Sequence, residues 1–219
     1  MNELESRYHS ILNRIQSIQP QSPDLTVIAV TKNRTIEQIH ALYRLGHRDF
    51  GENYAQEFIS KAQALKELGC TNISWHFIGH LQTNKVKQIL PYVSCIHTVD
   101  SVSLANELSK RWTAINPSVP LKVFLQVNID YESTKSGLSP DAVVQLKNEF
   151  TRFTSLAFQG LMCIPAKDNP RLAFQNLRSL ELQLRPLTQG NLSMGMSQDF
   201  ETAIQEGATH IRIGSAFFV

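Results

Sequence analysis

Two patterns of apolar and polar residues take turns along the chain. Short runs rich in apolar and β-branched residues are typical of strands buried in a parallel sheet. They are followed by longer stretches in which apolar residues recur every three or four positions, which is typical of amphipathic helices. The chain therefore predicts a regular alternation of strand and helix. Strands are expected at residues 25–32, 48–53, 74–79, 95–100, 121–129, 156–164, 192–196 and 210–218.

Helices are expected before the first strand and between the strands. The apolar repeat predicts helices over residues 4–18, 35–45, 54–68, 83–90, 101–114, 170–184 and 198–205, and a further helix that starts at Ser139. At that start Pro140 takes the first helical position and Asp141 follows in the first turn, a favourable order at a helix N-terminus. Strands that alternate strictly with helices favour a parallel sheet.

Eight strand–helix units that close on themselves form a (β/α)8 TIM barrel, which is the α/β fold we predict. An open doubly wound sheet is the alternative, because 219 residues are few for a barrel. No linker or repeat divides the chain. We therefore expect a single domain over residues 1–219, in which residues 1–19 form an extra helix that packs on the barrel.

The composition narrows the function without naming it. The net charge of +2 gives no reason to expect nucleic acid or an anionic membrane as a partner. No apolar run approaches the length of a membrane-spanning helix, and the acidic N-terminus does not resemble a signal peptide. Cys70, Cys95 and Cys163 are far apart and form no CxxC pair, so neither disulfides nor a structural zinc site are expected. A cytoplasmic location follows as the expectation.

A single cation ends the first predicted strand. Residues 25–31 are almost wholly apolar or β-branched, and Lys32 follows them. The carboxyl end of a barrel strand opens into the mouth of the barrel, where ligands bind. A lysine among apolar walls there can act as a neutral amine and attack a carbonyl group to form a Schiff base. The alternative is a lysine that opens the next helix and points to water.

Small and hydroxyl-bearing residues surround the last predicted strand. The stretch Ser193-Met-Gly-Met-Ser197 runs into a predicted helix, and its backbone N–H groups and hydroxyls suit a phosphate. Gly214 and Ser215 should lie beside it, at the usual phosphate site of barrels. An ordinary Ser/Gly turn that caps a helix is the alternative.

Arg212 stands between two isoleucines, so its side chain should point to the opposite face of the strand, into the barrel. Because a guanidinium only donates, it needs an acid such as Asp100 or Asp130, or an acceptor on a ligand. His76 and His80 have HxxxH spacing, but they fall across a strand end and no Glu follows His76. We therefore expect no metal site. No dinucleotide or P-loop glycine motif occurs.

A barrel-mouth lysine, a phosphate cradle on the last two strands and an inward arginine together describe a pyridoxal 5′-phosphate (PLP) site. With these features in place, the chain resembles the YggS/PROSC family of PLP homeostasis proteins, and within it the cyanobacterial PipY-type members. The resemblance is carried in order by AVTK (29–32), FGENYAQE (50–57), WHFIGHLQTNK (75–85), LSMGMS (192–197) and RIGSA (212–216).

The resemblance implies a monomeric barrel of fold type III, like the N-terminal domain of alanine racemase, that holds PLP as an internal aldimine on Lys32. It also implies that Arg212 donates to the pyridine nitrogen and that Asn53 lies near the ring hydroxyl. The phosphate would be bound by Ser193, Gly195, Gly214 and Ser215, with Met194 and Met196 packed nearby. His80, Asn84 and Ser197 belong to the same motifs, and the resemblance leaves their contact with PLP open.

The resemblance further implies a cytoplasmic protein of vitamin B6 and amino-acid homeostasis rather than an enzyme, with PLP-dependent apo-enzymes as transient partners. An arginine leaves the pyridine nitrogen unprotonated, and racemases of this fold use a second domain for which this chain has no residues. A weakly active racemase-like enzyme is the alternative. A lysine aldolase that acts on a sugar phosphate without PLP is a third hypothesis. The chain reads Ala216-Phe-Phe-Val219 where the family usually has a glycine after Phe, so the end of the last strand is expected to differ.

Overall fold

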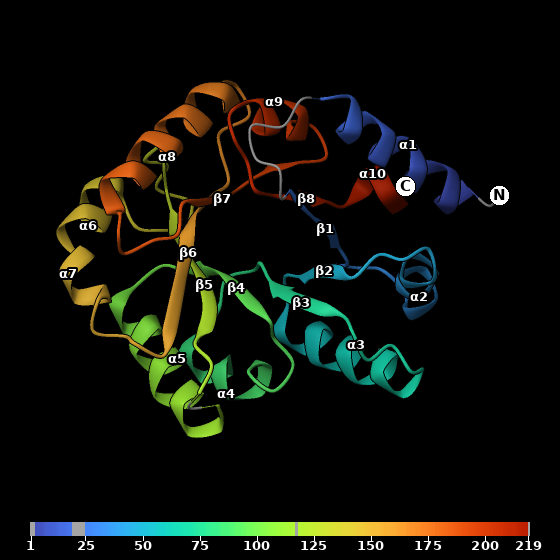
Figure 1. Ribbon diagram of the computed structural model, residues 1–219, viewed down its shortest axis with the longest axis horizontal. Coiled ribbons are helices and arrows are strands. Elements are labelled where there is room, and N and C mark those ends of the chain that lie inside the picture. Colours follow the sequence, from blue (N-terminus) through green and yellow to red (C-terminus); the bar gives the residue numbers. More distant parts are fainter. Residues whose placement is uncertain (1–2, 19–24, 117, 219) are drawn as a thin grey trace.

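The eight expected strands form one closed parallel barrel, in the order β1 to β8 (Figure 1). The computed structural model describes residues 3–18, 25–116 and 118–218. β8 pairs with β1 and closes the barrel, which confirms the predicted TIM barrel and excludes the open sheet. The strands are β1 (Thr26–Val30), β2 (Asp49–Glu52), β3 (Ser74–Phe77), β4 (Cys95–Val99), β5 (Leu121–Val127), β6 (Leu156–Cys163), β7 (Asn191–Met196) and β8 (His210–Ile213).

Helices surround the barrel (Figure 1). They begin where their sequences predict: Thr35 caps the helix after β1 in a capping box with Gln38, and Ser101 and Ser139 cap two others. The helices are α1 (Glu3–Ser17), α2 (Ile36–Arg44), α3 (Ala55–Glu67), the 3-10 turn η1 (Thr83–Lys85), α4 (Val86–Ile89), α5 (Val102–Ile115), α6 (Pro140–Gln145), α7 (Lys147–Phe150), α8 (Pro170–Leu184), α9 (Phe200–Gln205) and α10 (Ser215–Phe218).

The end of the chain differs from the prediction. The last strand was expected to run to residue 218, but β8 ends at Ile213 and residues 215–218 form α10. Phe217 and Phe218 have the apolar character of strand residues, yet both are buried in this short helix. The ring of Phe217 contacts that of Tyr8 in α1, with centroids 5.4 Å apart, so a distant helix stabilises the turn away from the sheet. Pro20 and Val219 lie outside the described residues.

The two faces of the barrel wall are filled by different kinds of residue. Val123 and Leu125 of β5 face the helices and belong to the main hydrophobic core, as does Phe58 of α3. Phe124 alternates with them and therefore points into the barrel, where it forms a small apolar cluster with Cys95 and Met162. Most barrels fill this interior with branched apolar residues, whereas much of this one is polar.

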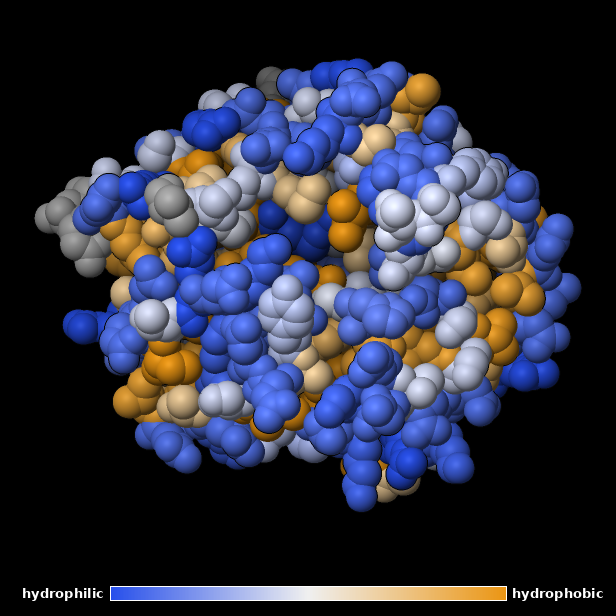
Figure 2. Space-filling model, turned by 180° about the vertical axis from the view of Figure 1, so that it is seen from behind, coloured by the Kyte–Doolittle hydropathy of each residue, from blue (hydrophilic) through white to orange (hydrophobic). Residues whose placement is uncertain are grey.

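Outside, the surface is mainly hydrophilic, and the face seen from behind Figure 1 is hollowed near its centre (Figure 2). No helix in the described part of the chain is both long and apolar enough to cross a membrane.

Candidate functional site

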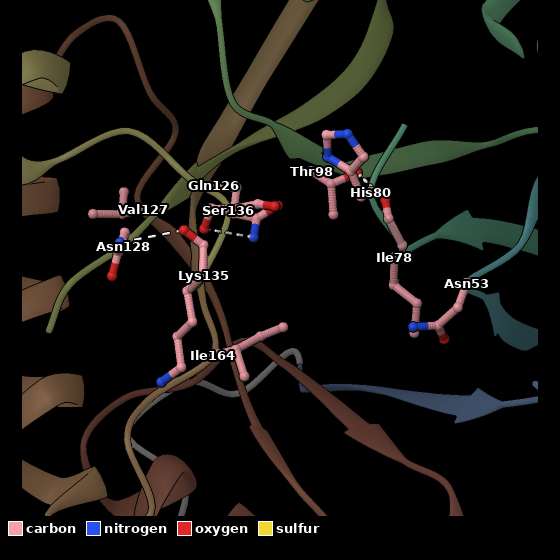
Figure 3. Close-up of a pocket in the computed structure, with 11 residues that line it drawn as sticks. Asn53, Ile78, His80, Thr98, Gln126, Val127, Asn128, Lys135, Ser136 and Ile164 are labelled. Carbon is pink, nitrogen blue, oxygen red and sulfur yellow. Dashed lines mark hydrogen bonds between the residues drawn. The ribbon is translucent and has the colours of Figure 1, made fainter. Parts of the chain in front are cut away.

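A cavity of about 230 Å³ lies at the carboxyl ends of β2 to β6 (Figure 3). Asn53 and Ile78 line one side of it, and Lys135 and Ile164 line the other (Figure 3). The remaining lining residues are Gly79, His80, Thr98, Gln126, Val127, Asn128 and Ser136. The cavity is therefore at the barrel mouth, where the sequence predicts the site.

Two buried side-chain oxygens in this cavity lack a hydrogen-bond partner. They are Oδ1 of Asn53 and Oε1 of Gln126, the only such atoms found in the described part of the chain. Buried polar atoms are nearly always paired, because an unpaired one costs about 1–3 kcal/mol. Both oxygens accept hydrogen bonds, so the cavity suits a ligand that carries donors. Asn53 is one of the residues predicted from the sequence, whereas Gln126 was missed.

Lys32 follows β1 on the same edge of the barrel. Its side chain is exposed, and its ammonium group makes no hydrogen bond or ion pair with any described residue. The next residue, Asn33, has a positive φ of 58°, which asparagine tolerates better than most residues and which bends the chain sharply after Lys32. Lys32 thus offers a free amine beside the mouth.

A buried ionic network behind β1 and β2 holds this turn in place. Lys61 of α3 donates through Nζ to the carbonyl oxygen of Thr31 at 2.7 Å, to Oε2 of Glu52 at 2.7 Å and to Oε2 of Glu57 at 2.6 Å. Glu57 also accepts from the backbone N–H of Asn33 at 3.2 Å. The network therefore contacts the residues on both sides of Lys32.

The same network fixes the residue that follows β2. Oε1 of Glu52 accepts from the backbone N–H of Asn53 at 2.7 Å, and Glu52 is fully buried. Sequence reasoning missed Lys61, and it gave no role to Glu52 and Glu57, which lie in the motif at residues 50–57. The spacing of Glu57 and Lys61 on one helix predicts an ordinary surface pair, and only the packing of α3 on β1 and β2 reveals the buried one.

The loops after β7 and β8 meet at Ser197. Its Oγ accepts from the backbone N–H of Gly214 at 3.1 Å and lies 3.5 Å from that of Ala216, which also donates to it. Two N–H groups thus converge on one oxygen, as in a cradle for an anion. Gly195 has a positive φ of 90°, and a Cβ there would lie 2.5 Å from the Cβ of Ala203, so only glycine lets the β7 loop pack on α9.

The other predicted residues of these strands take different positions. Ser215 is exposed at the start of α10, and Met196 is half-buried at the end of β7. Met194 is fully buried in the main hydrophobic core. Ser193 is fully buried too, and its hydroxyl lies inside the barrel, in contact with His97 and Arg212. Its predicted part in phosphate binding stays a prediction.

Arg212 lies inside the barrel, as predicted. Its Nη1 donates to Oγ of Ser193 at 2.8 Å and its Nη2 to the carbonyl oxygen of Cys163 at 2.9 Å. Burial lowers its pKa from the ordinary value. Neither acid considered from the sequence pairs with it: Asp100 lies 3.3 Å from His80, and Asp130 lies 3.8 Å from Lys135. Among the described residues Arg212 has no carboxylate partner.

His80 and Asn84, both from the motif at residues 75–85, take different positions. His80 lines the cavity, with Nδ1 3.3 Å from Asp100, whereas Asn84 is exposed on η1 and does not line it. Inside the barrel, ligand atoms of His76, Cys95 and His97 lie within 4.8 Å of one another, a grouping that no sequence spacing predicted. The imidazole nitrogens of this group already have hydrogen-bond partners, described below.

Lys135 is the second lysine at the mouth, and sequence reasoning missed it because it lies in an irregular loop after β5. Its Nζ donates to Oε1 of Glu132 at 2.6 Å and lies 3.8 Å from Asp130. Lys135 therefore has two carboxylates beside its amino group, whereas Lys32 has no ion-pair partner among the described residues.

Known proteins are similar to nearly the whole of this chain. Residues 7–219 match the family model for the N-terminal domain of alanine racemase. The chain is 39% identical to the pyridoxal phosphate homeostasis protein of Mus musculus over 218 residues, which cover 93% of this chain and 78% of that protein. It is 34% identical to the Escherichia coli K12 protein of the same name over 228 residues, which cover 100% of this chain and 97% of that one.

Solved structures of the same fold match this chain over nearly its whole length. PipY of Synechococcus elongatus, with PLP bound, superposes with a TM-score of 0.87 at 29% identity and covers 99% of this chain and 100% of its own. Alanine racemase of Clostridium difficile, at 14% identity and a TM-score of 0.72, shares the fold over 98% of this chain and 56% of its own. As the resemblance to the YggS/PROSC proteins predicted, the chain belongs to the family of pyridoxal phosphate homeostasis proteins, built on the alanine racemase N-terminal fold.

Proposed function

We propose that this protein binds PLP at the barrel mouth, holds it covalently through Nζ of Lys32, and takes part in PLP and amino-acid homeostasis. The likeness to PLP-bound PipY over 99% of the chain is the observation that carries the proposal. When bound, PLP supplies an aldehyde that joins amino groups and a ring that accepts electron density.

The residues present fit this group. PLP carries a phosphate and a ring hydroxyl, and the mouth offers the unpartnered oxygen of Asn53 for a donor such as that hydroxyl. The backbone N–H groups of Gly214 and Ala216 now donate to Oγ of Ser197, and a phosphate oxygen would take the place of that hydroxyl as their acceptor. Lys32 is the unpaired amine at the mouth, whereas Lys135 is paired with acids.

Each residue then has a part in holding the cofactor. Lys32 forms the covalent link and Asn53 accepts from the ring hydroxyl. The phosphate is bound by the loops after β7 and β8, through Gly195, Gly214 and Ser215, with Ser197 and Ser193 beside them and Met194 and Met196 packing nearby. Arg212 donates to the pyridine nitrogen, and His80 contributes at the cavity wall. Asn84, which is exposed on η1, is the residue for which we assign no contact.

We infer a carrier or regulator rather than an efficient enzyme. An arginine at the pyridine nitrogen donates a hydrogen bond without supplying a proton, so the ring withdraws electrons less strongly. The curated relatives are named for homeostasis rather than for a reaction. We propose that the protein acts as a monomer that passes PLP transiently to apo-enzymes in the cytoplasm. Its three buried, unbridged cysteines suit such a reducing compartment.

The test is the absorption spectrum of the purified protein after addition of PLP, before and after borohydride reduction. We expect a visible band that reduction removes, and a reduced cofactor on the peptide that contains Lys32. Lys32→Ala should abolish the band, while Lys135→Ala, the matched control at the same mouth, should retain it. A colourless protein would overturn the proposal, as would modification of Lys135 alone.

The regulator part of the proposal needs a second measurement. Racemisation and transamination are assayed across the common amino acids at high concentrations of PLP-loaded protein. We expect turnover far below the usual enzyme range of about 1–1000 s⁻¹. Turnover within that range would replace the carrier with a racemase-like enzyme.

A further inference from the structure

A continuous chain of hydrogen bonds crosses the interior of the barrel. Nη1 of Arg212 lies 2.8 Å from Oγ of Ser193, which lies 2.8 Å from Nδ1 of His97. Nε2 of His97 lies 2.9 Å from Nδ1 of His76, and Nε2 of His76 lies 3.1 Å from Oδ1 of Asp49. β4 and β7 are not neighbours in the sheet, so the contact between His97 and Ser193 passes through the barrel itself.

The two ends of this series give its bonds a direction. Arg212 can only donate, so Ser193 accepts from it. We assign the single hydroxyl hydrogen of Ser193 to Nδ1 of His97, which uses the donor of the hydroxyl as well as one of its lone pairs. A neutral imidazole that accepts at Nδ1 carries its proton on Nε2, so His97 donates to Nδ1 of His76. His76 must then carry its proton on Nε2 and donate to the carboxylate of Asp49.

In this assignment His97 uses one donor and one acceptor, which is the full capacity of a neutral ring. Nε2 of His76 also lies 3.4 Å from Oγ of Ser74, beside its contact with Asp49. Burial, together with nearby cationic and imidazole groups, holds the pKa of His97 well below its usual range, so this ring is neutral at pH 7. The direction runs without a break from a cation at one end to a carboxylate at the other.

The two ends of the chain face different parts of the molecule. Arg212 lies toward the mouth, one residue before the end of β8. Asp49, at the start of β2, lines a separate cavity of about 400 Å³ together with His76 and His210. Because all strands run in parallel, strand starts and strand ends lie at opposite ends of the barrel, so the chain spans it.

We propose that Ser193, His97 and His76 are positioning residues that fix the orientation of the Arg212 guanidinium from inside the barrel, with Asp49 as the anchor at the far end. The part of this inference that concerns the cofactor rests on the proposed function. Without this chain of hydrogen bonds, Nη1 of Arg212 loses its only side-chain acceptor among the described residues. The guanidinium is then held through the carbonyl of Cys163 alone.

This assignment also accounts for the His76, Cys95 and His97 cluster without a metal. An ion between Nδ1 of His76 and Nε2 of His97 would have to replace the proton that now joins them at 2.9 Å. The structure assigns that position to a hydrogen bond.

The first test needs no cofactor. Nitrogen NMR of the ¹⁵N-labelled protein reports which nitrogen of each histidine carries the proton and how the Arg212 guanidinium is held. We expect both His97 and His76 to be protonated on Nε2. Protonation of His97 on Nδ1 would overturn the proposal, and so would a stoichiometric transition metal in the purified protein.

Variants of His97 then test whether its hydrogen bonds, rather than the packing of its ring, hold Arg212. His97→Phe removes both hydrogen bonds but keeps a ring to stack on Phe124, whose centroid is 4.5 Å from that of His97. His97→Asn keeps an oxygen that can accept from Ser193. We expect His97→Phe and Ser193→Ala to shift the Arg212 resonances, and His97→Asn to restore them largely. Unchanged Arg212 resonances in Ser193→Ala and His97→Phe would overturn the proposal.

A matched control lies in the same interior. The ring of His210 is 5.7 Å from that of His97, but its Nδ1 contacts Oγ1 of Thr209 rather than the chain. His210→Asn should leave the Arg212 resonances in place, and a shift as large as that of His97→Phe would overturn the proposal. If His97→Phe fails to fold, as judged by thermal unfolding, Ser193→Ala and His97→Asn decide the same question.

The cofactor gives the second readout. With PLP bound, we expect His97→Phe to move the visible absorption band and to weaken binding roughly tenfold, the effect of losing one hydrogen bond to a charged group. His97→Asn should lie close to the wild type. If the wild type binds no PLP, the proposed function fails. The NMR experiment still decides whether the chain of hydrogen bonds from Arg212 to Asp49 exists. A band and an affinity unchanged in His97→Phe would overturn the role of the chain at the cofactor.

Discussion

Lys32 and Lys61 both lie at the end of β1 but have opposite environments. Nζ of Lys61 is bound by Thr31, Glu52 and Glu57, and the side chain of Lys61 is 8% exposed. Lys32 is exposed and has no hydrogen bond or ion pair with a described residue. One lysine is saturated with partners and the other has none.

This contrast shows that Lys61 has a structural role, whereas Lys32 is the lysine available for a reaction. A buried lysine paired with two carboxylates holds the backbone, because removing it would leave the buried carboxylate of Glu52 without its cation. An unpaired amine at the mouth is available to react with a carbonyl compound. Lys61 binds the carbonyl of Thr31, and its partner Glu57 binds the backbone N–H of Asn33, so the two together hold the residues before and after Lys32 in place.

The largest effect we expect comes from Lys32→Ala. Covalent attachment of PLP should be lost completely, while the free energy of unfolding changes by less than about 0.5 kcal/mol, as for other exposed side chains. Borohydride reduction with mass spectrometry measures the first and urea unfolding the second. A large loss of stability would mean that Lys32 is structural after all.

Lys61→Met should have the opposite main effect, a large loss of stability. Removing one partner from a buried ion pair costs about 3–5 kcal/mol, because Glu52 would be left charged and fully buried. Urea unfolding measures the loss, and the double variant Lys61→Met/Glu52→Gln should recover part of it. A loss below about 1 kcal/mol would show that the network does not hold the wall of the barrel.

Asn53→Ala sharpens the comparison within the mouth. Its Oδ1 is buried without a partner, so we expect the apo-protein to keep or slightly gain stability, by at most about 1 kcal/mol. PLP affinity should fall several-fold, because the acceptor for a ligand donor is gone. Titration followed by absorbance measures the affinity. A clear loss of apo-protein stability with unchanged affinity would contradict the assignment.

The smallest effect concerns pH. The hydrogen bond from Lys61 lowers the pKa of Glu57, although burial opposes it. A carboxyl group whose pKa is lower in the folded state adds stability above its unfolded value of about 4.3, and this is lost as the pH falls through the folded value. Urea unfolding from pH 7 to pH 3 should therefore show a gap between wild type and Glu57→Gln that narrows below about pH 4.5. A gap independent of pH would exclude this linkage.

Part of the candidate site was predictable because its signals are local. Strand ends in a parallel barrel share one edge, so Lys32 and Asn53 could be placed at the mouth from the pattern alone. Arg212 was expected inside because its neighbours in the strand are isoleucines, and this is where it lies. Lys61 could not be assigned, because an i,i+4 pair on an amphipathic helix gives the same pattern whether it is buried or exposed.

Other differences arose from contacts between distant segments. Phe217 and Phe218 suggested that the last strand continues, but packing against Tyr8 favours α10. Ser193 suggested a phosphate ligand by its position in a Ser/Gly stretch, and alternation along β7 directs its hydroxyl into the barrel. His76 and His97 lie 21 residues apart, and no spacing rule links them to Arg212.

By itself, the sequence determined the eight-fold alternation and the lysine at the end of the first strand, because hydrophobic periodicity and strand ends are properties of short segments. It favoured a barrel, but the pairing of β8 with β1 decided between a closed barrel and an open sheet. Only the tertiary structure decided which polar groups are saturated and which are free. That distinction depends on closure of the barrel, which brings Asp49, His76, His97, Ser193 and Arg212 into one chain. Within the described residues, Lys32 and the side-chain oxygen of Asn53 have no partners.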